Sequence, residues 1–178
     1  MLGKPLVSII IGTRPEAIKL APVIIEFKKC NSLDVRVLLT GQHKEMVTQV
    51  LELFDIKADI DLGIMKKSQS LAYITSSILK SLELEFMKYK PSLLIIQGDT
   101  SSAFSGALAA YYQKIPIAHV EAGLRTDDLY YPFPEEANRK LISQITTLHF
   151  APTETSAQNL IKSNNLGKIY ITGNTVID

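Results

Sequence analysis

A chain of 178 residues with 46% hydrophobic and 21% charged residues can bury the core of one domain of common size. Nineteen basic residues against 18 acidic ones leave a net charge of +1, which excludes a global field that would attract nucleic acid or anionic lipid. The single cysteine, Cys30, excludes an internal disulfide, so a reducing cytoplasm is the expected location. The apolar run Leu6–Ile11 is much shorter than the roughly 20 residues that span a bilayer, so neither a membrane segment nor a signal peptide is expected.

Short aliphatic runs alternate with helical patterns from one end of the chain to the other. The runs predict buried strands at Leu6–Ile11, Val35–Leu39, Leu93–Ile96, Ile117–Val120, Leu148–Ala151 and Ile169–Thr172. The patterns between them predict helices at Pro15–Lys29, Glu45–Phe54, Leu71–Tyr89, Ser101–Gln113, Glu135–Thr146 and Ser156–Lys162. Pro22 is expected to kink or divide the first helix.

Strands that are continuously apolar and that alternate with helices predict a parallel sheet covered on both faces. The expected fold class is therefore α/β, a doubly wound parallel sheet of the Rossmann-like kind. No linker, repeat or low-complexity tract interrupts the order of the elements. Residues 1–178 are accordingly expected to form one domain.

Polar or glycine-containing segments follow the predicted strands and should gather at the carboxyl edge of the sheet, where open α/β sheets bind ligands. The first of these segments lacks G-x-G-x-x-G, and the chain lacks a P-loop, so neither a dinucleotide cofactor nor a P-loop nucleotide site is indicated. Arg14 stands instead at a strand-to-helix junction, with Lys19 about a turn and a half later. These two cations either meet a diphosphate near the helix amino terminus or are merely exposed charges.

Acidic side chains at the ends of two strands are the candidates for acid–base chemistry. Asp99 follows Gly98. It is either a structural residue of a turn or helix cap, or a residue that contacts a ligand in the crevice. Glu121 directly follows a predicted strand, and a carboxylate there must face the crevice or have a partner. Glu135 and Glu136 open a helix, where acidic residues can simply complement the helix dipole.

The three histidines are too scattered to show the spacing of metal ligands, and no metal site is expected. His149 alternates into a predicted strand and is interpreted as a satisfied core histidine. His43 follows Gly41-Gln42 on the predicted rim, where it could contact a ligand.

Several short motifs occur in the order found in one enzyme family. They are Gly12-Thr-Arg-Pro-Glu-Ala-Ile-Lys19, Gly41-Gln-His43, Gly98-Asp-Thr100, His119-Val-Glu-Ala-Gly-Leu-Arg-Thr126, Pro134-Glu-Glu136 with Asn138-Arg139, and Gly173-Asn-Thr-Val-Ile-Asp178. Over nearly its whole length the chain resembles the non-hydrolysing UDP-N-acetylglucosamine 2-epimerases. This resemblance implies one half of a glycosyltransferase-B-like fold with the active cleft between two domains, and interconversion of UDP-N-acetylglucosamine and UDP-N-acetylmannosamine for surface polysaccharide, without a cofactor.

The same resemblance assigns site residues and a reaction route. The implied substrate-binding positions are Arg14, Lys19, His43, Asp99, Glu121 and Arg139, and the implied catalytic positions are Asp99, Glu121 and Glu135. The family's route eliminates UDP across carbons 1 and 2 to give 2-acetamidoglucal, and UDP is then added back with the proton on the other face. Such a route needs a carboxylate base, an acid and cations for the diphosphate. The residues leave open which carboxylate is the base.

The chain departs from the family pattern at several positions. Gln97 stands where many members have His, which is expected to adjust the rim without abolishing it. Some bacterial members bind a second substrate molecule as an activator. Of the positions associated with that regulatory site, Gln42 and Glu136 are retained, whereas Glu45 and Ser68 replace Gln and Arg. The resemblance therefore carries over only part of a regulatory site.

The family pattern also continues beyond this chain, into a carboxyl-terminal domain that holds most of the nucleotide and is expected to be absent here. The expected partners are UDP-N-acetylglucosamine and that domain or a separate half-chain, with a homodimer in the full-length form. The lone chain is expected to fold but to be inactive. The same architecture also serves the acceptor domain of a nucleotide-sugar glycosyltransferase, and a non-catalytic module that binds a partner or a nucleotide sugar is a further alternative.

Overall fold

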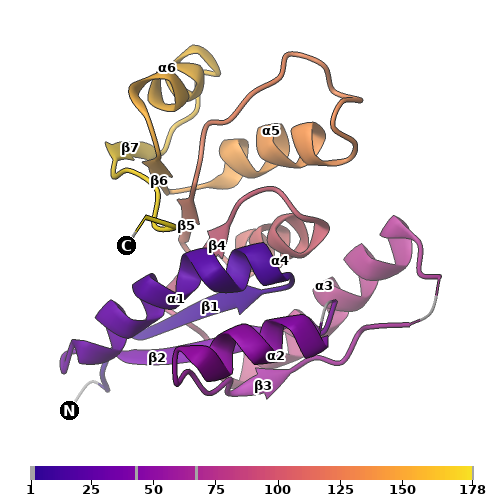
Figure 1. Cartoon of the computed structure of the whole chain (residues 1–178), viewed down its shortest axis with the longest axis vertical. Coiled ribbons are helices and arrows are strands. Elements are labelled where there is room, and N and C mark those ends of the chain that lie inside the picture. The colour runs from indigo at the N-terminus through magenta and orange to yellow at the C-terminus, as the bar shows by residue number, and fades with distance from the viewer. Residues whose placement is uncertain (1–2, 43, 67, 178) are drawn as a thin grey trace.

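A computed structural model describes residues 3–42, 44–66 and 68–177, and its centre is a seven-stranded parallel sheet. The strands are β1 (Leu6–Ile11), β2 (Asp34–Leu39), β3 (Ile60–Asp61), β4 (Leu93–Gln97), β5 (Ile117–Val120), β6 (Leu148–Ala151) and β7 (Lys168–Ile171). The helices are α1 (Arg14–Lys29), α2 (Lys44–Leu53), α3 (Leu71–Lys88), α4 (Ser101–Tyr112), α5 (Glu135–Ile145) and α6 (Glu154–Lys162). Figure 1 shows the sheet running through the length of the molecule.

The strand order is β3-β2-β1-β4-β5-β6-β7. The chain first winds outward from β1 to β3, then crosses back to β4 beside β1, and winds outward in the other direction to β7. All neighbouring strands are parallel. The prediction of a doubly wound α/β sheet is confirmed, and the order reverses between β1 and β4, which is where sheets of this kind bind ligands.

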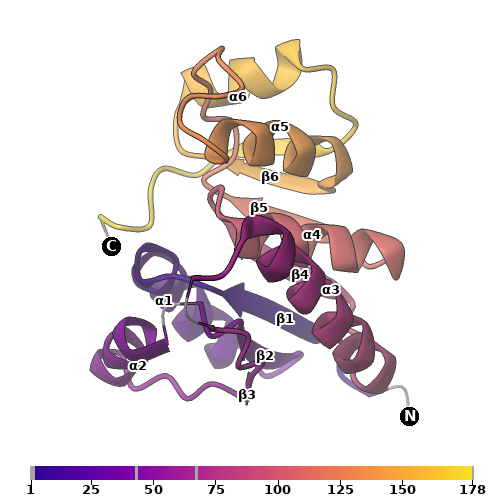
Figure 2. The same cartoon turned by 90° about the vertical axis from the view of Figure 1, so that its right-hand side faces the viewer.

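Apolar side chains on both faces of each central strand explain why those strands are continuously aliphatic. Ile9 and Ile11 of β1 pack in a core shared with α1 and α2, whereas Ile10 between them packs in a second core with α3 and α4. Successive strand residues point to opposite faces, so a strand that is covered on both sides needs an apolar residue at each position. Figure 2 shows α1 and α2 on one side of the sheet and α3 and α4 on the other.

Three details differ from the expectations. The strand β3 was not predicted, because a two-residue strand leaves no aliphatic run to detect. Of the two expected effects of Pro22, division of the helix is wrong: α1 continues through Pro22, and residues on both sides of it, Leu20 and Ile24, are buried against the same core. Helix α6 begins at Glu154, before the expected Ser156, because the Thr153 side chain accepts a hydrogen bond from the Ser156 amide and caps the helix.

No helix in the described parts of the chain is both long and apolar enough to cross a membrane.

Candidate active site

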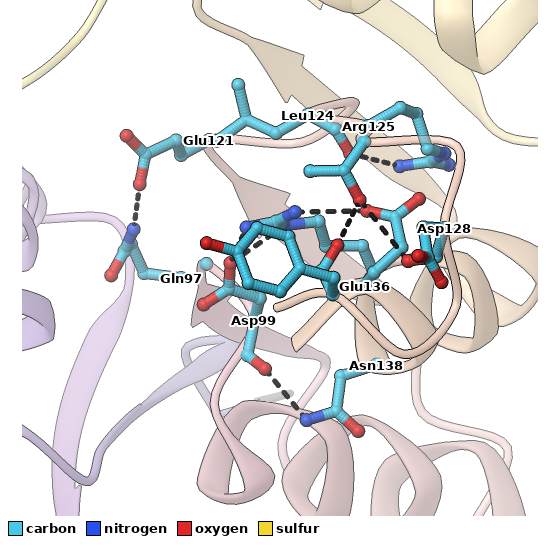
Figure 3. Close-up of polar contacts among 12 residues, drawn as sticks. Gln97, Asp99, Glu121, Leu124, Arg125, Asp128, Glu136 and Asn138 are labelled. Atoms are coloured by element: carbon cyan, nitrogen blue, oxygen red, sulfur yellow. Dashed lines mark hydrogen bonds and ion pairs between the residues drawn. The ribbon is translucent and has the colours of Figure 1, made fainter. Parts of the chain in front are cut away.

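Glu121 is the meeting point of three parts of the chain at the carboxyl edge of the sheet. It follows β5 directly, and its side chain is 13% exposed. The Nζ atom of Lys19 on α1 lies 2.5 Å from its Oε2 atom. Figure 3 shows Gln97, at the end of β4, whose Nε2 atom donates to the same oxygen. The Nδ2 atom of Asn174, after β7, donates to the other oxygen at 3.2 Å. Both carboxylate oxygens therefore have positively polarised partners.

Asp99 is the second carboxylate at this edge, one strand away from Glu121. It lies between β4 and α4, and Arg139 on α5 approaches its Oδ2 atom with Nη2 at 2.7 Å and Nε at 2.8 Å. Asn138 Nδ2 donates to the Asp99 backbone oxygen at 2.8 Å (Figure 3). Helix α5 thus holds both the side chain and the backbone of Asp99, and the side chain remains 24% exposed.

Arg139 also contacts a fully buried carboxylate, that of Glu136 one turn earlier on α5. Its Nη1 atom lies 3.0 Å from Glu136 Oε2. Burial disfavours the charged guanidinium, but hydrogen bonds to Glu136 and Asp99 outweigh it and raise the pKa of Arg139 above its ordinary value. Arg139 is therefore a fixed cation between two carboxylates.

Arg14 stands on the same edge but outside both clusters. Its side chain is exposed and has no hydrogen bond or ion pair with a residue that the structure describes. It borders a hollow of about 260 Å³ that is lined by Arg14, Pro15, Ile18, Lys19 and Val176. Arg14 is therefore a free cation beside Lys19, at the amino terminus of α1.

The other predicted site residues are placed as follows. Glu135 is half-buried at the start of α5 and has no hydrogen-bond or ion-pair partner in the described part of the chain. Glu136, besides its contact with Arg139, lies 3.8 Å from Lys140 Nζ. Gln42 accepts a hydrogen bond from Ser102 Oγ at 2.7 Å. His43 lies outside the described residues.

Two histidines, His119 on β5 and His149 on β6, are buried in the sheet beneath this edge. The Nε2 atom of His119 lies 2.6 Å from the backbone oxygen of Gly98. Because a carbonyl oxygen can only accept a hydrogen bond, Nε2 carries the proton of the neutral ring. Burial, the largest cause, lowers the pKa of His119 to about 4. His149 is fully buried, as predicted, and the Asn165 side chain is its polar neighbour, in a contact that falls outside strict hydrogen-bond geometry. Burial lowers its pKa to about 4 as well.

Sequence reasoning missed the contributions of Gln97 and Asn174. Gln97 was interpreted only as a departure from a family pattern, yet it donates to Glu121. A polar residue that ends an otherwise aliphatic strand was the available signal. Asn174 lies in the motif Gly173-Asn-Thr-Val-Ile-Asp178, but the sequence could not identify its partner, since Glu121 lies 53 residues earlier in the chain. Among the residues that the structure describes, no group of three or more His, Cys, Asp or Glu side chains could hold a metal ion.

Comparison with known proteins shows strong similarity to one family. A sequence model of UDP-N-acetylglucosamine 2-epimerases matches residues 25–178. The UDP-N-acetylglucosamine 2-epimerase of Neisseria meningitidis is 55% identical over 170 residues, which are 95% of this chain and 46% of that protein. The chain thus spans about half the length of the curated relatives it matches.

Solved structures agree with the sequence comparison. The crystal structure of the UDP-GlcNAc 2-epimerase from Neisseria meningitidis bound to UDP-GlcNAc matches with a TM-score of 0.92 and 53% identity, over 97% of this chain and 47% of that chain. The Methanocaldococcus jannaschii UDP-GlcNAc 2-epimerase in complex with UDP-GlcNAc and UDP matches with a TM-score of 0.88 and 38% identity, over 95% of this chain and 46% of that chain. A MurG structure from Acinetobacter baumannii, at 14% identity and a TM-score of 0.63, shares the fold alone. Together, the family match and these close structural relatives show that the chain belongs to the UDP-N-acetylglucosamine 2-epimerase family.

Proposed function

We propose that this chain is the amino-terminal half of a non-hydrolysing UDP-N-acetylglucosamine 2-epimerase, which interconverts UDP-N-acetylglucosamine and UDP-N-acetylmannosamine. The observation that carries the proposal is the pair of carboxylates at the carboxyl edge. Asp99 and Glu121 follow adjacent strands, and each is paired with a cation. In a chain of this family, that arrangement suits proton transfer next to a departing diphosphate.

The chemistry explains why carboxylates and cations are needed together. The proton on carbon 2 of the sugar is not adjacent to a carbonyl, so its removal must be coupled to departure of UDP from carbon 1. The carbon 2–hydrogen and carbon 1–oxygen bonds break, a double bond forms between the two carbons, and the intermediate is 2-acetamidoglucal. Adding UDP back while a proton arrives on the opposite face inverts carbon 2.

Asp99 is the residue we assign as the base. Arg139 holds one oxygen of its carboxylate, whereas the other has no partner among the described residues and can accept a proton. Both oxygens of Glu121 are engaged by donors, which orients this side chain. We assign Arg14 and Lys19 to the diphosphate. When Lys19 turns from Glu121 to the diphosphate, it releases one oxygen of Glu121, and we assign Glu121, which can then carry a proton, and Glu135 to the return of the proton.

We further propose that a carboxyl-terminal half supplies the other wall of the cleft, either in the same polypeptide or in a separate chain, and that the complete protein is a homodimer. Without that wall the nucleotide loses binding energy and water reaches the intermediate, so the lone chain should be inactive. An exposed free thiol at Cys30 suits a reducing cytoplasm, where the product would serve surface-polysaccharide synthesis.

The test is a proton-exchange experiment in deuterated water. The 178-residue chain is incubated with UDP-N-acetylglucosamine, alone and together with a separately expressed carboxyl-terminal half. We expect no product from the chain alone, and UDP-N-acetylmannosamine with deuterium at carbon 2 from the combination, with traces of UDP and 2-acetamidoglucal. Transfer of the sugar to an acceptor without deuterium uptake would favour a glycosyltransferase, and efficient turnover by the lone chain would contradict the need for a second half.

A further inference from the structure

A buried carboxylate, that of Glu16, lies behind the candidate site and has no part in the chemistry proposed above. Glu16 is in the first turn of α1 and is 2% exposed. Its Oε2 atom accepts hydrogen bonds from the backbone amides of Gly12 and Thr13, each at 2.6 Å. An acidic residue in this position commonly accepts from the amide that precedes the helix, so these two bonds alone describe an ordinary helix start.

The third hydrogen bond of Glu16 is not explained by capping its own helix. The Thr100 hydroxyl, 84 residues away in sequence, donates to Glu16 Oε1. The same hydroxyl accepts the amide of Ala103 at 3.0 Å and caps α4. A chain of hydrogen bonds therefore runs from the first turn of α4 through Thr100 to Glu16, and from Glu16 to the loop between β1 and α1.

These hydrogen bonds join the β1–α1 loop to the β4–α4 turn, which lie on the two adjacent strands between which the strand order reverses. The loop from β1 to α1 leads directly to Arg14, and the turn from β4 to α4 contains Asp99 next to Thr100. The β1–α1 loop is also in tight contact with the first turn of α4, because a Cβ atom added at Gly12 would lie 2.2 Å from Ser102 Oγ. Glu16 is thus bonded to the loop that carries a proposed diphosphate cation and to the turn that carries the proposed base.

We propose that Glu16 is a positioning residue that fixes the β1–α1 loop relative to the β4–α4 turn, and thereby Arg14 relative to Asp99. The consequence for catalysis rests on the proposed function, whereas the mechanical link does not. A buried charge costs free energy unless it is fully hydrogen-bonded. Here burial raises the pKa of Glu16, and the bonds from Thr100, Gly12 and Thr13 oppose that rise. An acidic residue on the surface could cap α1 without the free-energy cost of burying a carboxylate, so the burial of Glu16 indicates a role beyond capping.

Amide hydrogen exchange in the 178-residue chain tests the link. Glu16→Ala removes the hydrogen bonds from the Gly12 and Thr13 amides. These two amides should therefore exchange faster whether Glu16 only caps α1 or also fixes Thr100. The decisive amide is Ala103, which contacts Thr100 and not Glu16. If Glu16 fixes Thr100, exchange at Ala103 should accelerate about tenfold, the change expected when a hydrogen bond of typical net strength is lost. Unchanged protection of Ala103 in a folded variant would overturn the proposal.

Three further variants keep this test decisive. Glu16→Met has a similar length but no strong hydrogen-bond acceptor or donor, and it replaces Glu16→Ala if the latter does not fold. Thr100→Ser retains the hydroxyl and should leave Ala103 protected. Glu154→Gln is a matched control, because Glu154 is also an acidic residue in the first turn of a helix but is exposed. Acceleration of Ala103 in the Glu154 variant as large as in the Glu16 variants would also overturn the proposal.

Kinetics of the enzyme completed with a carboxyl-terminal half separate this inference from the proposed function. Glu16→Met, which cannot accept a strong hydrogen bond from Thr100, should lower kcat about 10- to 100-fold with a smaller change in KM, because a displaced catalytic group loses rate more than binding. If exchange at the Ala103 amide accelerates in the Glu16 variant while kcat stays normal, Glu16 has no role in catalysis. Absence of epimerase activity in the unmodified enzyme would refute the proposed function, while the exchange result would still decide the mechanical link.

Discussion

At the scale of single residues, Glu121 combines an uncommon backbone conformation with a dense set of side-chain contacts. Its φ is 61°, a region that costs a residue with a side chain about 1–2 kcal/mol. The contacts with Lys19, Gln97 and Asn174 hold the carboxylate in this position. Backbone strain that is maintained by specific partners is common at functional sites, which agrees with the role proposed for Glu121.

Neutral, shape-preserving substitutions of the two carboxylates test that role. In the enzyme completed with a carboxyl-terminal half, Asp99→Asn or Glu121→Gln should lower kcat about 100- to 10,000-fold, the usual contribution of general acid–base catalysis. The dissociation constant for UDP-N-acetylglucosamine should change much less. Asp127→Asn serves as a control, because Asp127 is an exposed charge on the loop before α5. Normal deuterium uptake at carbon 2 in both carboxylate variants would show that neither residue transfers the proton.

At the scale of elements, the segment that follows β7 leaves the edge of the sheet and returns to α1. Figures 1 and 2 both show this last part of the chain beside α1. The Thr175 hydroxyl donates to the backbone oxygen of Lys19 at 2.7 Å, and Asn174 donates to Glu121. The segment is therefore attached both to the helix that carries Lys19 and to the carboxylate that Lys19 contacts.

Loss of this attachment should affect Glu121 without unfolding the domain. Asn174→Ala removes a hydrogen bond to a charged group, which is worth about 1.5–3 kcal/mol, and should lower kcat of the completed enzyme by about tenfold or more. The reduction should be smaller than that of Glu121→Gln. Thr175→Ser keeps its hydroxyl and should behave like the unmodified chain. Circular dichroism melting would detect global unfolding, and an unchanged kcat in a folded Asn174→Ala enzyme would contradict the attachment.

At the scale of the whole molecule, two buried histidines make stability depend on pH. The ordinary pKa of 6.5 is lowered to about 4 for His119 and for His149, mainly by burial. Between these values the unfolded chain binds protons that the folded chain does not. Stability contributed by the neutral rings is therefore present above pH 6.5 and is lost as the pH falls from 6.5 toward 4.

Urea denaturation of the 178-residue chain between pH 7.5 and pH 4 should show this loss. A pKa difference of this size corresponds to about 3 kcal/mol for His119, so the free energy of unfolding should fall steadily below pH 6.5. His119→Gln can still donate to the Gly98 backbone oxygen but cannot be protonated, and its pH dependence should be shallower. Identical slopes for the variant and the unmodified chain would show that His119 titrates normally in the folded state.

The order of every element except β3, and the edge of the sheet on which the candidate residues lie, were determined by the sequence alone. A strand covered on both faces must be apolar throughout, so β1, β4 and β5 could be predicted from their aliphatic runs. In a parallel sheet the carboxyl ends of strands share one edge, which placed Asp99 and Glu121 there. The two-residue β3 could not be predicted, because it exists only through its pairing with β2. The continuity of α1 through Pro22 could not be predicted either, because it depends on the burial of residues on both sides of the proline.

Only the tertiary structure decided which side chains are partners. Lys19 and Glu121 are 102 residues apart in sequence, and Asp99 and Arg139 are 40 apart. No local pattern links such positions, because the contact depends on how β1, β4 and β5 are ordered and on where α5 packs. The same reason applies to Glu16, whose sequence context predicts a helix start and whose bond to Thr100 exists because the reversal in strand order places β1 beside β4.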